Sequence, residues 1–440
     1  MQNVDSDVCK LSNGRHANCR IIDMAGYLPR VADGDLERRL RAIGAVVIEG
    51  PKACGKTWTA SQFAVTTFRL DEDPTIRALV RNAPDQLFDN PVPILFDEWQ
   101  VEPSLWNRVR RQVDDRHGKG LYILTGSATP NDDTTRHSGA GRFGVIRMRP
   151  MSLFESNHSN GQVSLKALLE GEQQQGNGQH LSFIDVVQRM VIGGWPGLLD
   201  SDEEEARDWL RDYLRQIAEV DIQGLGARRN PGNIRRLLAS LGRSVGQSTK
   251  STEIAKDVGG DDGPIARDTL ANYLNALDRL HIIDNSEAWR PHMRSRTRLR
   301  QAPVRYLVDP SLGLAALDIG STELLRDLNA LGLHFEALVV RDLRVYTQPL
   351  GGTVDSWRDS NGHEVDAIIR IRDNMWGAFE IKLGHDAVDE AAESLFRFAA
   401  KVDVSRHGKP AFLGVIISNG SYAYRREDGI HVIPIGCLGP

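Results

Sequence analysis

Three short runs of apolar residues, each ending at polar residues or glycine, lie in the first third of the chain. They cover residues 45–48, 93–96 and 121–124. Apolar runs of this length are typical of strands buried on both faces, as in a parallel sheet. Helical patterns at residues 36–43 and 58–67 flank the first run. The alternation predicts an α/β domain built around a parallel sheet.

Helical patterns dominate the middle of the chain. They mark residues 182–192, 202–220, 233–241, 251–258 and 267–280, and a short strand pattern follows at 281–283. The last three helices and this strand have the order of a winged helix-turn-helix. Residues 251–253, Ser-Thr-Glu, predict a capped start for the second of these helices.

These patterns, with the Gly-, Gln- and Asn-rich stretch at 157–181, divide the chain into five segments. We predict a polar tail at 1–20, an α/β core at 21–160, a linker and helical segment at 161–225, a winged helix-turn-helix at 226–310, and an α/β domain at 311–440.

Composition narrows the class of protein but names no partner. With 440 residues, 40% of them hydrophobic, the chain can fill about three domains. A net charge of -5 means that any nucleic-acid surface has to be a local patch. The four cysteines include no C-x-x-C pair, and no apolar run is long enough to cross a bilayer. We therefore expect a cytoplasmic protein with no zinc site and no membrane partner.

The segment after the first apolar run has the pattern of a phosphate-binding loop, G-x-x-x-x-G-K-[ST]. Its position between a strand and a helix lets backbone N–H groups and the helix N-terminus face a phosphate. The lysine would reach the β- and γ-phosphates of ATP, and the final threonine would hold Mg²⁺. The residues of the loop are Gly50, Pro51, Lys52, Ala53, Cys54, Gly55, Lys56 and Thr57.

Polar residues follow the other two strands, at the sheet edge where open α/β sheets hold ligands. Asp97 is expected to hold Mg²⁺ directly or through one of the ion's other ligands, and Glu98 to orient or deprotonate the attacking water. Ser127 would sense the γ-phosphate or else cap the next helix. Arg142 would bring positive charge to the transferring phosphoryl group, in its own or a neighbouring subunit, or else be a plain surface residue.

These motifs support a resemblance to a known family. The phosphate loop, the D-E-W-Q at 97–100, the L-T-G-S at 124–127, the G-R at 141–142 and the P-M-S-L-F-E at 150–155 resemble a family of bacterial and archaeal AAA-type ATP-binding proteins. In that family an ATPase core precedes a winged helix and a C-terminal domain of unknown function with a restriction-endonuclease-like fold. The resemblance covers nearly the whole chain and implies this order of domains here.

Residues 289–305, where the wing hairpin is expected, hold six arginines and no acid. Alternating arginines on a hairpin project to one face and could follow a phosphate backbone of DNA or RNA. An interface rich in Arg–carboxylate pairs would use the same residues. The candidates for nucleic-acid contact are Arg290, Arg294, Arg296, Arg298 and Arg300.

A second cluster of acids is predicted in the last domain. Glu380 and Lys382 share one face of a strand, and Asp366 joins them if the preceding strand pairs in a hairpin. Two carboxylates could then hold a divalent ion beside a lysine. The order resembles the restriction-endonuclease-like superfamily, and this resemblance implies a site formed by Glu336, Asp366, Glu380 and Lys382. His363 and His385 flank it as loop histidines.

The sequence thus predicts an ATP-binding, Mg²⁺-dependent ATPase that acts on DNA, with metal-dependent DNA cleavage by the last domain. The alternative is a nucleotide-gated switch or adaptor that binds a protein partner and whose nuclease-like domain lacks catalysis. The oligomeric state and the pathway stay open.

Overall fold

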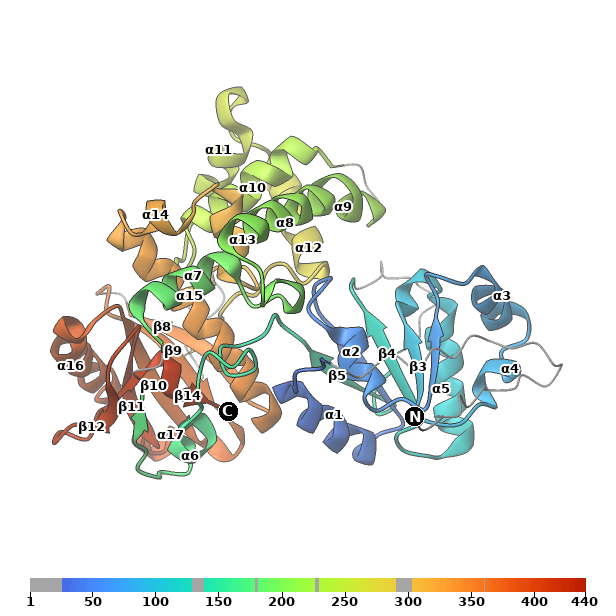
Figure 1. The fold of residues 1–440 in the computed structure, drawn as a ribbon, viewed down its shortest axis with the longest axis horizontal. Helices are drawn as coiled ribbons and strands as arrows, with labels where there is room; N and C mark the ends of the chain where they lie inside the picture. Colours follow the sequence, from blue (N-terminus) through green and yellow to red (C-terminus); the bar gives the residue numbers. More distant parts are fainter. Residues whose placement is uncertain (1–25, 129–137, 179–180, 226–228, 290–302, 360) are drawn as a thin grey trace, which may run out of the picture. The chain divides into compact units, whose positions relative to one another are not determined.

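The structure is a computed structural model of the chain, and it describes residues 26–128, 138–178, 181–225, 229–289, 303–359 and 361–440. By its internal contacts the chain forms two compact units, residues 1–148 and residues 149–440. Figure 1 colours the first unit blue to cyan and the second from green through yellow to red.

The first unit contains a five-stranded sheet in the order β2-β3-β4-β1-β5, in which neighbouring strands run parallel. The strands are β1 (Ala45–Glu49), β2 (Thr66–Arg69), β3 (Ile94–Asp97), β4 (Tyr122–Gly126) and β5 (Phe143–Arg147). The predicted parallel α/β core is therefore present.

Helices cover both faces of this sheet, because successive side chains of a strand point to opposite faces. In β1, Val46 and Ile48 pack in one apolar cluster with α1 (Val31–Ala42) and α2 (Lys56–Ser61). Ala45 and Val47 belong to a second cluster on the other face. That cluster includes α3 (Pro74–Asn82), α4 (Asp85–Phe88) and α5 (Ser104–Arg116). Burial on both faces explains the apolar runs at residues 45–48 of β1 and 94–96 of β3.

The second unit begins with short elements and helices. These are β6 (Val163–Ser164), α6 (Leu165–Leu169), β7 (Gly176–Asn177), α7 (Phe183–Ile192), α8 (Glu203–Gln216), a π-helical turn (Ile217–Asp221), α9 (Ile222–Gly224), α10 (Pro231–Arg243), α11 (Ser251–Gly259) and α12 (Arg267–Arg279). Asp202 and Glu205 form a capping box at the start of α8, as their position at a helix start suggests. The capped start expected at residues 251–253 is wrong, because Lys250 is the N-cap residue of α11 and its side chain makes no cap hydrogen bond.

Isolated antiparallel bridges join segments that lie between and after the three helices α10, α11 and α12. They join Gln247 to Arg305, Ile283 to Leu307, and Ser286 to Val304. The last two bridges join segments 283–286 and 304–307, which precede and follow the five candidate arginines in the sequence. Arg290, Arg294, Arg296, Arg298 and Arg300 themselves lie outside the described residues.

A seven-stranded sheet in the order β7-β12-β13-β11-β10-β9-β8 forms the core of the C-terminal part. Its later strands are β8 (Thr353–Arg358), β9 (Glu364–Arg370), β10 (Trp376–Lys382), β11 (Phe412–Ile417), β12 (Tyr422–Arg425) and β13 (His431–Pro434), and β14 (Leu438–Gly439) pairs separately with β6. The accompanying helices are α13 (Pro310–Ala316), α14 (Ser321–Leu324), α15 (Leu328–Thr347), α16 (Val388–Ala399) and α17 (Val404–His407). Part of the predicted linker, 161–225, thus belongs to the fold, since β7 pairs with β12 and β6 with β14.

A buried arginine connects distant segments of the second unit. Arg341 of α15 pairs with Asp309 at 2.8 Å and with Asp342 at 2.7 Å. The same two carboxylates accept hydrogen bonds from the backbone N–H groups of Gly194 and Leu153. A buried charge is tolerated only when it is paired and hydrogen-bonded, so these contacts stabilise the chain crossings around α15. No helix of the described chain has the length and apolarity that a membrane span requires.

His334 of α15 makes the stability of the second unit depend on pH. Its side chain is buried, and burial lowers its pKa to about 4. Between that value and about 6.5, the usual pKa of histidine, the unfolded chain binds a proton that the folded chain does not. Stability is therefore present above this window and is lost as the pH falls through it.

We predict that His334→Gln reduces this loss by about 3 kcal/mol at pH 4, the equivalent of the pKa difference. Urea unfolding followed at several pH values between 4 and 7 measures the effect. His385→Gln changes an exposed histidine and should leave the pH dependence as in the parent. Parallel curves for the parent and His334→Gln would contradict the prediction.

Candidate nucleotide site and C-terminal acid cluster

The loop at residues 50–57 has a backbone shaped for close approach to a ligand. It leaves β1 and turns into α2, as the motif requires. A Cβ atom on Gly50 would clash with the carbonyl oxygen of Met148, so a larger residue there would displace the loop. Ala53 (φ 61°) and Gly55 (φ 100°) are left-handed, which curves the backbone as in anion-binding loops.

Lys56 lies at the start of α2 with its side chain folded over the loop. Its Nζ donates a hydrogen bond to the Pro51 carbonyl at 2.8 Å, and only 5% of the residue is exposed. Arg30 also contacts the loop, since its guanidinium donates to the Cys54 carbonyl at 2.8 Å. The loop therefore holds a buried positive charge where the sequence predicts phosphate.

Asp97, at the end of β3, lies between two hydroxyl groups. Thr57 Oγ1 donates to its Oδ1 at 2.9 Å, and Thr125 of β4 donates to the same oxygen. Burial raises the pKa of the Asp97 carboxyl, and the two hydroxyl donors oppose the shift. A carboxylate beside a threonine hydroxyl is a donor set that suits Mg²⁺, so these residues fit the ion that the sequence predicts.

Glu98 follows in a left-handed conformation, with φ 52° and ψ 47°. Ser127 Oγ donates to Glu98 Oε2 at 2.9 Å, and the side-chain amide of Gln100 donates to the same oxygen. The amide also reaches Ser127 Oγ at 3.2 Å. The structure thus brings Glu98 and Ser127 together, although the sequence predicted a role for Ser127 toward phosphate.

Arg142 is paired with a residue of α5. Its Nε lies 2.7 Å from Asp114 Oδ1, and this hydrogen bond lowers the pKa of the Asp114 carboxyl. Within the described chain no hydrogen bond or ion pair joins Arg142 to the loop or to Glu98. The structure therefore does not bring Arg142 to the other predicted catalytic residues.

The hairpin expected in the C-terminal domain is present. Strands β9 and β10 are antiparallel, and their register ends at the pair Ala367 and Phe379. Asp366 directly precedes Ala367, and Glu380 directly follows Phe379, so both acids lie just beyond this last pair. Lys382 Nζ lies 2.7 Å from Glu380 Oε2 and 3.6 Å from Asp366 Oδ2. Asp366 also accepts a hydrogen bond from the backbone N–H of Ile381 at 2.7 Å. Two carboxylates and one ammonium group therefore meet at this strand end.

Glu336 of α15 adds a third carboxyl group, and Tyr306 donates a hydrogen bond to it. Burial and the charge of Asp366 raise the pKa of Glu336 well above its usual value. The same two causes raise the pKa of Glu380 to about 8. Burial alone would lower the pKa of Lys382, but the neighbouring carboxylates outweigh it and raise this pKa. Three carboxyl groups thus share one lysine.

The cluster has more carboxyl groups than positive charges, which favours binding of a cation. No group of three or more His, Cys, Asp or Glu side chains in the described ranges is arranged to hold a metal ion. Mg²⁺, however, usually binds to one or two carboxylates and keeps several waters. The histidines expected to flank the site have other contacts: His363 lies 3.0 Å from Asp359, and the His385 ring stacks on Tyr424.

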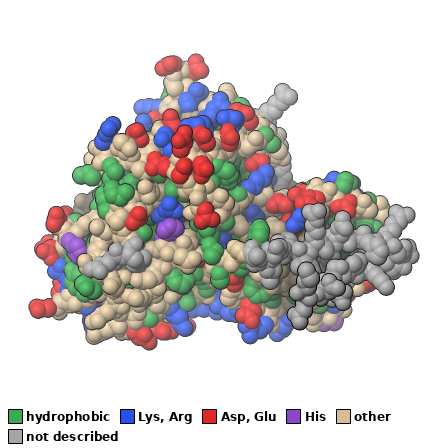
Figure 2. Space-filling view, viewed as in Figure 1, with side chains coloured by type: hydrophobic (Ala, Val, Ile, Leu, Met, Phe, Trp, Pro, Cys, Tyr) green, Lys and Arg blue, Asp and Glu red, His purple; other side chains and the backbone are tan. Residues whose placement is uncertain are grey.

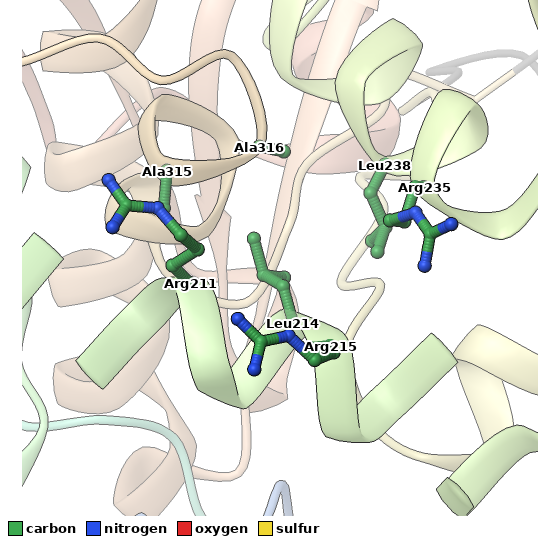
Figure 3. Close-up of a pocket in the computed structure, with 7 residues that line it drawn as sticks. All are labelled: Arg211, Leu214, Arg215, Arg235, Leu238, Ala315 and Ala316. Atoms are coloured by element: carbon green, nitrogen blue, oxygen red, sulfur yellow. The ribbon is translucent and has the colours of Figure 1, made fainter. Parts of the chain in front are cut away.

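A separate cavity of about 300 Å³ lies in the second unit, with an apolar floor and three arginines at its rim (Figure 3). Its lining residues are Arg211, Leu214, Arg215, Arg235, Leu238, Ala315 and Ala316. Each arginine is already ion-paired with a nearby acid. Figure 2 shows carboxylates gathered where α8 lies, so the rim carries no excess positive charge for an anion.

Matches to family models now identify the first unit. Residues 43–157 match the model described as an AAA domain. The first unit carries an AAA-type P-loop ATPase domain. Residues 184–323 and 331–438 match two domains of unknown function, DUF8612 and DUF4143. The expected AAA-type core and the C-terminal domain of unknown function are therefore confirmed.

Three of the solved structures that match this chain show distant likenesses. A Walker-type ATPase of Pyrococcus abyssi is 13% identical with a TM-score of 0.40, over 66% of this chain and 96% of that chain. A DNA replication initiation factor is 15% identical with a TM-score of 0.22, over 57% and 90%. A signal transduction ATPase with a tetratricopeptide repeat sensor from Pyrococcus horikoshii is 13% identical with a TM-score of 0.26, over 74% and 53%. No curated protein matches this chain. Likenesses this low assign no function.

Three residues of these sites received no role from the sequence. Thr125 and Gln100 lie inside the L-T-G-S and D-E-W-Q motifs, but only the acids and the serine of those motifs were singled out. Tyr306 lies 30 residues before Glu336, and no local pattern links the two. A polar threonine inside the otherwise apolar β4 was the one signal available.

We predict that Lys56→Ala weakens ATP binding roughly 100-fold, because a hydrogen bond to a charged group contributes about 1.5–3 kcal/mol. Titration calorimetry with Mg²⁺ and ATP measures the change in affinity. Lys119→Ala removes an exposed lysine of the same unit and should bind ATP like the parent. Equal affinity of Lys56→Ala and the parent would remove the basis of the nucleotide site.

Proposed function

We propose that the protein is a Mg²⁺-dependent ATPase that acts on DNA, and that its C-terminal domain cleaves DNA with the help of a divalent ion. The ATPase part is carried by one observation. Lys56, Thr57 and Asp97, from the loop, α2 and β3, converge at the carboxyl edge of a parallel sheet. This is the edge at which open α/β sheets bind ligands.

The chemistry of hydrolysis follows from these positions. Lys56 and the loop N–H groups bind the phosphates, while Thr57 and Asp97 would hold Mg²⁺. When bound, this ion neutralises charge on the phosphate oxygens. Glu98, the carboxylate that follows Asp97 in the chain, accepts a proton from the attacking water. Arg142 would act only after leaving Asp114, within its own subunit or in a neighbouring one.

The DNA part rests on the arrangement of the second unit. Three helices, α10, α11 and α12, precede bridged segments at 283–286 and 304–307, which is the order of a winged helix. The five arginines of the stretch between those segments supply the positive charge. Phosphate contacts of this kind give affinity without sequence preference.

We predict that replacing Arg294, Arg296 and Arg298 together by alanine weakens DNA binding about equally for all sequences. The slope of log affinity against log salt concentration should become shallower by about one unit for each phosphate group that the variant no longer binds. Fluorescence anisotropy at several salt concentrations measures both effects. A triple variant with Arg211, Arg215 and Arg235 replaced by alanine has the same change in net charge and should bind like the parent. DNA binding that survives in the first variant would exclude the wing as the DNA site.

Cleavage is the second proposed activity, and the acid cluster where the start of β9 lies beside the end of β10 favours it. Asp366 and Glu380 would hold the divalent ion with Glu336 close by, and Lys382 would stabilise the developing charge. When bound, the ion polarises the phosphodiester and lowers the pKa of a water.

We predict that Asp366→Ala and Glu380→Ala each abolish nicking of supercoiled DNA and leave ATP hydrolysis nearly unchanged. The reason is that the two reactions use separate acids. Agarose gels with Mg²⁺ or Mn²⁺, beside a phosphate-release assay, measure the two activities. Glu393→Ala removes an exposed acid of α16 and serves as the control.

Cutting that persists in both variants would point to another site. If the parent never cuts but hydrolyses ATP, the protein is the nucleotide-gated adaptor, and the acid cluster is structural.

A further inference from the structure

The side-chain amide of Gln100 lies at the centre of the contacts around Glu98. Its nitrogen donates to Glu98 Oε2 and to Ser127 Oγ, the latter at 3.2 Å. A carboxylate can only accept hydrogen bonds, so the amide atom facing Glu98 has to be nitrogen. Ser127 donates to the same carboxylate oxygen at 2.9 Å. Both donors therefore hold Glu98 by one oxygen.

The other oxygen of Glu98 is left for a different partner. Glu98 Oε1 has no hydrogen-bond partner among the parts of the chain that are described. A general base needs one oxygen within reach of the water and must be held in a fixed direction. Anchoring Oε2 while leaving Oε1 without a partner meets both needs.

The amide of Gln100 is itself fixed by the end of β4. Its Oε1 is buried without a hydrogen-bond partner. A Cβ atom on residue 126 would lie 3.0 Å from this oxygen and 2.9 Å from Trp99 Nε1, so glycine leaves the space that both side chains occupy. The flipped amide would place this oxygen against the Glu98 carboxylate, where two acceptors repel each other, so the nitrogen faces Glu98.

We propose that Gln100 is a positioning residue for ATP hydrolysis: its amide anchors Oε2 of Glu98 and thereby directs Oε1 toward the attacking water. This role rests on the proposed ATPase function. Gln100 touches neither ATP nor water in this role, and it acts through Glu98 alone. It follows that its removal lowers kcat without changing the affinity for ATP.

The test is Gln100→Met, which keeps the length of the side chain but cannot donate a hydrogen bond. We expect kcat to fall roughly 10- to 100-fold, a part of the contribution of a general base. The Kd for ATP with Mg²⁺, measured by calorimetry, should stay within about twofold. Gln112→Met changes a glutamine of α5 whose amide oxygen accepts from Arg116, and its kcat should equal that of the parent.

A double-mutant cycle separates positioning from a structural role. In a Glu98→Gln background, Gln100→Met should cause no further fall in the residual rate, because the group that it positions is gone. A fall of equal size in both backgrounds would overturn the proposal. If Gln100→Met does not fold, Gln100→Glu keeps the size and places an acceptor against Glu98, with the same expected decrease in kcat.

The outcome also distinguishes this proposal from the function on which it rests. A parent protein that neither binds nor hydrolyses ATP overturns both. A parent that hydrolyses ATP at the same rate as Gln100→Met overturns only the role of Gln100.

Discussion

The buried carboxylate of Asp97 is the group on which the nucleotide site depends. Its Oδ1 accepts hydrogen bonds from Thr57 and Thr125, so one oxygen joins α2, β3 and β4. Burial disfavours its charged form, and the two hydroxyl groups supply part of what water would otherwise provide. Neither hydroxyl carries a full positive charge, and the arrangement therefore leaves the carboxylate able to share a cation.

The same edge of the sheet makes two sequence motifs into one structural unit. The Oγ1 of Thr125 donates a hydrogen bond to Asp97 and accepts one from the backbone nitrogen of Glu98 at 3.3 Å. Gly126 leaves space for the side chains of Trp99 and Gln100, and Ser127 donates to Glu98. Residues 125–127, at the end of β4, thus contact residues 97–100, at the end of β3. The effects of substitutions in the two motifs should therefore not be additive, because contacting residues do not act independently.

The sequence predicted best where the relevant residues are adjacent or follow a period. The phosphate loop is contiguous, and the meeting of Asp366 with Glu380 follows from strand alternation and one hairpin. It failed where tertiary contacts decide. The predicted linker forms strands because β6 pairs with residues about 275 positions later, and Ser251 does not cap α11 because the chain enters the helix one residue earlier. Tyr306 was missed because its hydrogen bond to Glu336 joins residues that no local pattern relates. Gln100 lies two residues from Glu98, but the direction of its side chain depends on Gly126 and Ser127 at the end of β4, which the sequence does not place beside it.

The negative charge of Asp97 and that of the C-terminal acid cluster are balanced by different groups. This difference affects how easily a cation can enter each site. At Asp97 the balance comes from neutral hydroxyl groups, whereas at Glu380 it comes from the ammonium of Lys382 at 2.7 Å. A cation entering the first site displaces only hydroxyl hydrogen bonds, but one entering the second has to compete with a buried ion pair. Burial and the charge of Asp366 raise the pKa of Glu380 to about 8, and the ammonium group of Lys382 offsets them only in part. Phosphate of a nucleic acid would add uncompensated negative charge there unless a divalent ion came with it. If the C-terminal domain acts on DNA as proposed, binding of DNA and of metal at this site should therefore depend on each other.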